Sequence, residues 1–336
     1  MNLFLRASSI DKKFFSRLLF KYPSLNLSYL TSLEKLYCFG NQINSLDFAN
    51  STFIKEIECS SNSLTSIQIS NLPELTLLNC NDNDLQNLDL NGLISLDNLN
   101  CSNNQINNIN FGNANNINTL NCNSNQLTNL NVSKNKLLIE LMCGYNSLSS
   151  LDVSKNTTLI KLLCQYNVHH LNNLDVTKNT ELEILNCSVN RLNNLDVSNN
   201  NFLKELVCYG NKLSFLEVSK NLTLEVLNCG DNLLTSLDIS KNKDLKELRC
   251  DYNKLSFLEI YNNKILEVLD CQSNFLDSLD VSKNIALKEF KCNRNKFKNI
   301  DISQNVALEE LHCTKNQLKN LNVSNNVSLT ILFCDQ

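Results

Sequence analysis

Several residue types are scarce in this sequence of 336 residues, and each shortage excludes a class of protein. Only 6 Gly and 2 Pro are present, so the usual turn signals of a chain of mixed helices and strands are missing. No apolar run approaches the roughly 18 residues of a membrane-spanning helix, and we expect no membrane insertion. The net charge of -4, from 30 Lys and Arg against 34 Asp and Glu, provides no basic surface for nucleic acid.

Cysteine, in contrast, is abundant and regularly spaced. Neighbouring cysteines are 21 residues apart, except for one interval of 23; the 15 residues are Cys38, Cys59, Cys80, Cys101, Cys122, Cys143, Cys164, Cys187, Cys208, Cys229, Cys250, Cys271, Cys292, Cys313 and Cys334. A fixed period of this size is typical of a solenoid, in which each coil buries its apolar edge against its neighbours. One architecture therefore replaces the two domains that the length alone would suggest.

The repeating unit reads LxxLxCxxNxLxxLDVSxNxx, as in residues 138–158. It resembles the leucine-rich repeat family, whose pattern LxxLxLxxN it matches with Cys at the third apolar position. The resemblance covers about residues 25–336 and implies stacked parallel β-strands on a concave face. The two halves of the unit repeat nearly the same pattern, which leaves no room for a helix, so we predict an extended back. This nested form resembles the short bacterial repeats called IRREKO type.

These patterns predict a leucine-rich repeat solenoid of about 15 coils over residues 25–336, shaped as a mildly curved right-handed rod of about 65–70 Å. A short capping helix is expected within residues 1–24, because Ser8 and Asp11 resemble a capping box and Pro23 ends an apolar run at helical spacing. One two-residue insertion falls near residues 168–170, within the single interval of 23.

The ends of the chain carry two further expectations. The first residues lack the apolar segment of a secretory signal, which predicts a cytoplasmic protein as the chain stands, and a secreted or cell-surface one if it is a trimmed fragment. Only two residues follow Cys334, so the last coil stops halfway. We favour trimming; the alternative is that a partner, or a second copy by self-association, covers this edge.

The cysteines are interpreted as a core column. Zinc sites need clustered spacing, and parallel neighbouring coils hold their Cβ atoms too far apart for a disulfide. An Asn stands three residues after each of the first 14 cysteines; we expect these amides to satisfy turn backbone groups and one another. Neither column predicts a cofactor or a metal.

Acidic residues recur nine residues after many cysteines, at Asp47, Asp89, Asp152, Asp196, Asp238, Asp280 and Asp301. Calcium binding is one interpretation. Ser often follows two residues later and Lys three residues later, which favours hydrogen bonds to the Ser and the turn backbone, with Lys screening the stacked charges.

The positions that flank each cysteine on the predicted strand face outward and vary. Polar Asn79, Asn100, Asn121, Asn186 and Asn228 alternate there with apolar or aromatic side chains, and a charged stretch follows at Arg249, Asp270, Lys291, Arg294, His312 and Lys315. Exposed aromatic and Met side chains are typical of interface hot spots, although they could instead pack on each other. The predicted partner-binding residues are Met142, Tyr145, Leu163, Tyr166, His169, His170, Val207 and Tyr209.

His169 and His170 lie in the insertion, which can be a tolerated bulge, a pH-sensitive contact or a metal site. No catalytic motif occurs in the sequence. We therefore expect no enzyme, and a protein-interaction module that uses the concave strand face and binds a protein partner. The alternative is an adhesive or structural spacer that binds carbohydrate or an ordered surface through its Asn residues.

Overall fold

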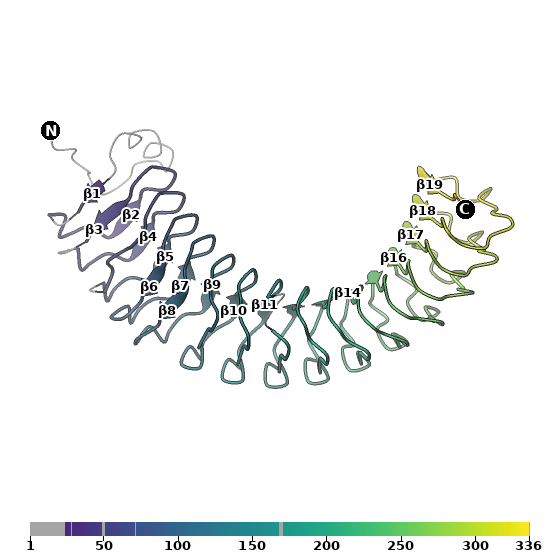
Figure 1. The fold of residues 1–336 in the computed structure, drawn as a ribbon, viewed down its shortest axis with the longest axis horizontal. Helices are drawn as coiled ribbons and strands as arrows, with labels where there is room; N and C mark the ends of the chain where they lie inside the picture. Colours follow the sequence, from purple (N-terminus) through teal and green to yellow (C-terminus); the bar gives the residue numbers. More distant parts are fainter. Residues whose placement is uncertain (1–23, 28, 49–50, 71, 168–170, 336) are drawn as a thin grey trace. The chain divides into compact units, whose positions relative to one another are not determined.

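The computed structural model describes residues 24–27, 29–48, 51–70, 72–167 and 171–335. Within these ranges the chain is a parallel β-solenoid with no helix (Figure 1). None of the described residues belongs to a helix that is long and apolar enough to cross a membrane. The predicted capping helix in residues 1–24 lies outside the described residues apart from Ser24, which begins the first strand. The chain divides into two compact units, Met1–Thr158 and Leu159–Gln336.

The first unit contains a parallel sheet on one side of the solenoid and short paired strands on the other. The sheet consists of β2 (Lys35–Tyr37), β4 (Glu56–Glu58), β5 (Leu77–Asn79), β7 (Asn98–Asn100), β9 (Thr119–Asn121) and β10 (Glu140–Met142). On the back, β1 (Ser24–Asn26) pairs with β3 (Ser45–Asp47), and β6 (Asn87–Asp89) with β8 (Asn108–Asn110). The back is extended, as the nested repeat predicts.

The second unit continues the same plan with one strand per coil. Its parallel sheet consists of β11 (Lys161–Leu163), β12 (Ile184–Asn186), β13 (Glu205–Val207), β14 (Val226–Asn228), β15 (Glu247–Arg249), β16 (Val268–Asp270), β17 (Glu289–Lys291), β18 (Glu310–His312) and β19 (Ile331–Phe333). β11 pairs with β12 residue for residue, so the insertion in this coil leaves the strand register unchanged.

The register places equivalent residues beside each other and so builds a continuous core. In the main sheet from β2 to β18 the middle residue of the strand and the cysteine that follows it are buried, as in β14, whereas the first residue and, except for Asp270, the third residue are not fully buried. Each strand has only three residues, but the same side chains stack from coil to coil. A Leu that would be half exposed in an isolated coil is thereby removed from water, which stabilises the stack.

Fourteen cysteines are buried free thiols, which confirms the core interpretation, and Cys334 in the last coil is exposed. Burial raises the pKa of the Cys229 thiol to about 12, and it raises the pKa of the neighbouring Cys250 thiol as well. A thiol that stays protonated in an apolar environment is a poor nucleophile and a poor metal ligand. The buried cysteines therefore serve to pack the core.

The asparagines that stand three residues after the cysteines, which we call the Asn ladder, close the turn after each cysteine. Asn232 donates from Nδ2 to the carbonyls of Cys208 and Cys229, at 3.0 and 3.1 Å, and its Oδ1 accepts the Leu213 amide at 3.0 Å. Asn211 and Asn253 make the equivalent bonds one coil away. These amides bond to the backbone of two coils and not to one another, so the expectation that they pair among themselves was wrong.

The acidic column on the back is structural too. The Asp238 carboxylate accepts the Ser240 amide at 2.9 Å, and hydrogen bonds to the Ser240 amide and side chain lower its pKa. Asp152 with Ser154 and Asp280 with Ser282 repeat this arrangement. These carboxylates accept the local hydrogen bonds that the sequence predicts.

Candidate functional site

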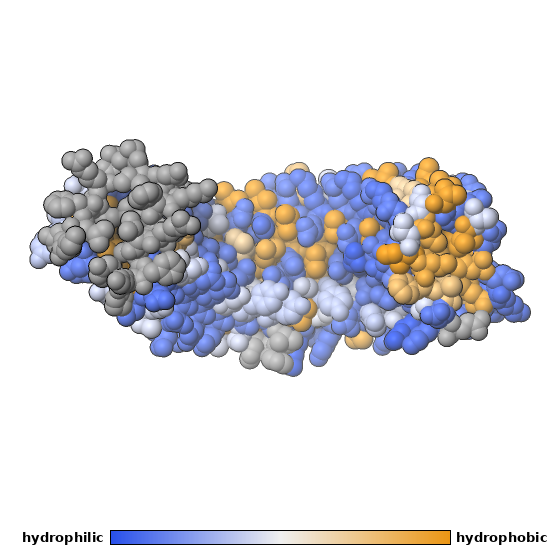
Figure 2. Space-filling model, turned by 90° about the horizontal axis from the view of Figure 1, so that it is seen from above, coloured by the Kyte–Doolittle hydropathy of each residue, from blue (hydrophilic) through white to orange (hydrophobic). Residues whose placement is uncertain are grey.

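The strand face of the second unit consists of the outward side chains of β11 to β19. The first residues of the strands form one row: Lys161, Ile184, Glu205, Val226, Glu247, Val268, Glu289, Glu310 and Ile331. The third residues form a parallel row: Leu163, Asn186, Val207, Asn228, Arg249, Asp270, Lys291, His312 and Phe333. The residue directly after each cysteine extends the face beyond the strand. In Figure 2 isolated apolar side chains lie among hydrophilic ones along the solenoid.

Three predicted partner-binding residues of this unit, Leu163, Val207 and Tyr209, occupy these rows. Leu163 and Val207 lie on either side of Asn186 in paired strands and are half-buried. Tyr209 directly follows Cys208 and is half-buried, whereas Tyr166 stands one residue later in its coil and is 43% exposed. The tyrosines therefore belong to two rows, not one.

A left-handed backbone position explains this difference. The second residue after the cysteine has a positive φ in every coil from Gly40 to Lys315, including Tyr166 at 59° and Tyr252 at 48°. Side chains other than Gly rarely adopt this conformation, but the Asn ladder holds the turn in place. Tyr252, which the sequence analysis did not select, is 47% exposed and joins Tyr166 and Tyr209 as the tyrosine cluster. Burial, followed by the charges of Asp231 and Asp251, raises the pKa of Tyr209.

Two carboxylates are buried beside the tyrosine cluster. Asp251 directly follows Cys250, and Asp270 is the third residue of the neighbouring β16; they are 8% and 5% exposed. Burial, reinforced by the charge of Asp270, raises the pKa of Asp251 to about 6. Burial also raises the pKa of Asp270. Two neighbouring buried carboxylates lower the stability of the fold when both are ionised.

Gly230 makes room for this arrangement. It occupies, in the coil between them, the position equivalent to Tyr209 and Asp251. A Cβ atom at Gly230 would collide with Asp251 Oδ1 and would lie 3.1 Å from Tyr209 Cδ2. The Asp251 carboxylate and the edge of the Tyr209 ring therefore both lie next to the position that a side chain at residue 230 would occupy.

Three residues of the charged stretch that the sequence indicated, Arg249, Lys291 and His312, contact glutamates across the two rows. Arg249 Nε lies 2.6 Å from Glu247 Oε1, and its Nη1 lies 3.7 Å from Glu289 Oε1. Lys291 Nζ lies 2.8 Å from Glu289 Oε1 and 3.3 Å from Glu310 Oε1. His312 Nε2 lies 2.7 Å from Glu310 Oε1. The glutamates of the first row were missed in the sequence, although their spacing from the third row places them on the same face.

The other predicted positions belong to the first unit or lie outside the described residues. Met142 ends β10 of the first unit and is half-buried, and Tyr145 is exposed at a left-handed position. His169 and His170 lie outside the described residues. Among the described residues, no three His, Cys, Asp or Glu side chains come together as they would around a metal ion.

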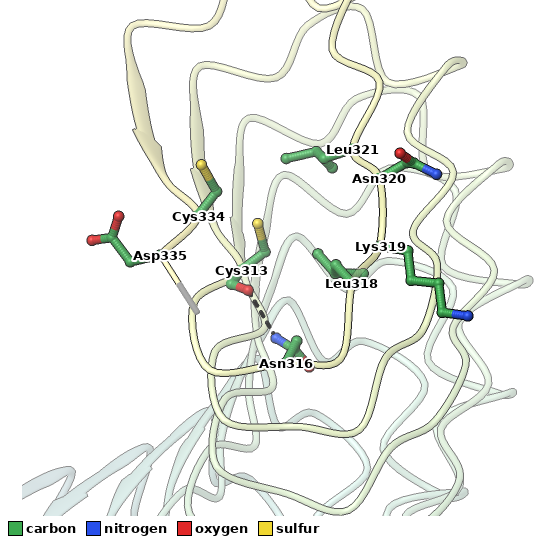
Figure 3. A pocket seen from close by; sticks show the side chains of 8 residues that line it. All are labelled: Cys313, Asn316, Leu318, Lys319, Asn320, Leu321, Cys334 and Asp335. Carbon is green, nitrogen blue, oxygen red and sulfur yellow. Dashed lines mark hydrogen bonds between the residues drawn. The ribbon is translucent and has the colours of Figure 1, made fainter.

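A pocket opens at the end of the last coil (Figure 3). It is lined by Cys313, Asn316, Leu318, Lys319, Asn320, Leu321, Cys334 and Asp335. Lys319 and Asp335 point away from its interior, and the Asn316 amide is bonded to the Cys313 carbonyl at 3.0 Å. The pocket is lined in part by core residues of this coil. The side chains of β19 are exposed, and Figure 2 shows a large apolar area near one end of the molecule. The lining of the pocket offers no arrangement of groups for chemistry.

Comparison with solved structures identifies the repeat. The functional domain of InlJ from Listeria monocytogenes, whose solved structure includes a cysteine ladder, is 32% identical to this chain, with a TM-score of 0.84. The chain is a leucine-rich repeat protein. The match covers 86% of this chain and 64% of the solved InlJ chain. A ladder of cysteines is also what the 21-residue period predicts for the core of this leucine-rich repeat protein.

Two other leucine-rich repeat structures share the fold at lower identity. A protein of Leptospira interrogans is 22% identical with a TM-score of 0.74, covering 93% of this chain and 82% of that one. The plant peptide hormone receptor RGFR1, solved in complex with RGF2, is 21% identical with a TM-score of 0.72, covering 94% and 57%. Neither the models of protein families nor the curated protein sequences provide a match.

Proposed function

We propose that this leucine-rich repeat protein is a non-enzymatic interaction module that binds a protein partner through its strand face. The observation that carries the proposal is the set of exposed Tyr and apolar side chains on a backbone bonded from coil to coil. Leu163, Tyr166, Val207 and Tyr209 would provide contacts in the second unit, and Met142 and Tyr145 in the first. His169 and His170 remain part of the proposal as neighbours in sequence.

Rigidity gives such a surface its advantage. Each strand is bonded to both neighbours, and the Asn ladder fixes the turn that carries the tyrosines. Binding then costs little ordering of the backbone. Tyr provides a large contact area with few rotatable bonds and a hydroxyl for a hydrogen bond. RGFR1 and HAESA were each solved in complex with a peptide hormone, which supports the same class of function here.

A paired set of variants tests the proposal. Tyr166→Ala with Tyr209→Ala alters the strand face, and Phe215→Ala with Phe257→Ala is the control, because these two Phe are exposed outside the two rows. Proteins captured by the wild type are identified by mass spectrometry, purified and titrated by calorimetry. We expect the tyrosine variant to lose at least about tenfold in affinity and the control less than about twofold.

Equal affinity of the tyrosine variant would refute the proposal. A glycan array distinguishes the alternative function: saturable binding to a carbohydrate that depends on Asn186 and Asn228, and not on the tyrosines, would indicate an adhesive spacer. Both variants should unfold at nearly the wild-type temperature, because the replaced side chains are largely outside the core.

A further inference from the structure

We propose that the strand face binds an arginine side chain of its protein partner at Asp251 and Asp270, beside the ring of Tyr209. This inference rests on the proposed interaction function and adds the chemistry of the partner. Asp251, Asp270, Gly230 and Tyr209 together form what we call the acidic site.

The first argument is that the Asp251 carboxylate lacks a partner of its own. It is more than nine-tenths buried, yet apart from its own backbone amide no described residue donates a hydrogen bond to it. Asp270 has weak local bonds only, from the Gln272 amide at 3.2 Å and the Gln272 side chain at 3.1 Å. Buried carboxylates are normally paired with a cation or with several donors.

The second argument is that the nearby cations are already engaged. Arg249 is directly opposite Asp270 in the sheet, but its guanidinium extends along the first row to Glu247 and Glu289. Lys291, on the other side of Asp270, bonds Glu289 and Glu310. Arg249 and Lys291 therefore both pair with glutamates of the first row, and within the described part of the chain no ion pair joins either cation to Asp251 or Asp270.

The third argument is the shape that Gly230 creates. Because this residue has no side chain, the Tyr209 ring and the Asp251 carboxylate can both lie next to it. A guanidinium group is planar, donates to two carboxylates at once and stacks on an aromatic ring. An ammonium group meets the charge requirement but not the planar one, which is why arginine is proposed rather than lysine.

The titration of the site agrees with this geometry. Asp251 has a pKa of about 6 because of burial and Asp270, with Asp231 acting in the same direction and Arg249 against it; Tyr209 faces the same carboxylate. A bound cation stabilises the ionised form. Arginine affinity should therefore rise between about pH 5 and pH 7.5 as Asp251 loses its proton.

The probe for the experiment is N-acetyl-arginine methylamide, titrated at pH 7.5 into protein with 13C-labelled tyrosine rings and followed by NMR. We expect a saturable shift of the Tyr209 resonance. Asp251→Asn with Asp270→Asn should weaken the affinity at least about tenfold. Asp238→Asn with Asp280→Asn is the matched control, since these carboxylates lie on the back and bond serines; it should bind like the wild type.

Absence of a saturable shift in the wild type, or equal affinity in the Asp251 and Asp270 variant, overturns the proposal. The uncharged N-acetyl-glutamine methylamide should not bind, and saturable binding of it to the same site also counts against arginine. Failure here is distinguishable from failure of the interaction function. A partner that loses affinity with the tyrosine variant but keeps it with the Asp251 and Asp270 variant leaves the interaction module in place and removes only the arginine contact.

Discussion

Replacing one residue of the Asn ladder should cost more than its small size suggests. In Asn232→Ala the Leu213 amide loses the Oδ1 acceptor that lies 3.0 Å away in a buried position. The carbonyl oxygens that accept hydrogen bonds from Asn232 Nδ2 keep other donors in this variant. The Cys208 carbonyl still accepts Asn211 Nδ2 at 3.0 Å, and the Gly230 carbonyl still accepts the Gly210 amide at 3.0 Å. The unpaired Leu213 N–H therefore determines how much the free energy of unfolding falls.

An unpaired buried N–H costs about 1–3 kcal/mol, and the space left by the amide adds to this. We expect Asn232→Ala to lower the free energy of unfolding by about 2–3 kcal/mol. The variant Asn232→Asp separates the contribution of the amide oxygen from that of the amide NH2 group. It keeps an acceptor for Leu213 but places a carboxylate against the carbonyl oxygens of Cys208 and Cys229, so it should be more destabilising at pH 7 than at pH 4.

The assay is urea denaturation followed by far-UV circular dichroism, because the chain has no Trp. Asn228→Ala is the control: Asn228 is half-buried on the strand face and accepts only the Gly230 amide at 3.3 Å. It should cost less than about 0.5 kcal/mol. Equal losses for the two Ala variants would show that the ladder does not stabilise the turn through its hydrogen bonds. A separate early transition for Asn232→Ala would agree with nearest-neighbour stability in a repeat protein.

Three shorter predictions follow from burial, backbone strain and charge. A thiol reagent at pH 8 should label Cys334 rapidly and the fourteen buried cysteines only after unfolding; fast labelling of several thiols in the folded protein would contradict the core column. Val189 has a φ of 49°, which is strained for a β-branched side chain, so Val189→Asn should raise the melting temperature, and an unchanged or lower one would show that its packing outweighs the strain. Asp251 has a folded pKa of about 6 against an ordinary 3.8, so its ionisation destabilises the fold as the pH rises through 6. Asp251→Asn should therefore stabilise the protein by about 1–2 kcal/mol at pH 7.5 and by little at pH 4, and a pH-independent difference in urea denaturation would exclude this cause.

The core could be predicted from the sequence because it is periodic. One cysteine every 21 residues, with Leu at fixed offsets, identifies the strand, its buried face and the parallel register at once. The left-handed turn position could not be predicted in the same way. Tyr166, Val189 and Lys315 occupy it, and none of these residue types favours a positive φ; the ladder imposes the conformation from outside.

Asp251 and Gly230 of the acidic site escaped the sequence analysis for a related reason. The residue directly after the cysteine varies from coil to coil and is Asp only at Asp251 and Asp335. An acid at such a position has no periodic signal and resembles a solvated charge. The burial of Asp251 depends on the fold around it, where the carboxylate occupies the space that a Cβ atom at Gly230 would need. By contrast, Tyr166 and Tyr209 could be selected from the sequence, because a single aromatic residue at an outward position already indicates an interface.

The Asn ladder also bears on how such a chain can change in length. Each ladder amide bonds only its own coil and the one before it, so removing or adding one whole unit between equivalent cysteines leaves every turn with a complete set of partners. Removing or adding a segment that is not a whole unit would disrupt the hydrogen bonds of the Asn ladder in two coils. Lys212 to Glu217 reads KLSFLE, and the same six letters return at Lys254 to Glu259, two units later. Whole-unit duplication would produce this, and it would lengthen the strand face while leaving each existing contact in place.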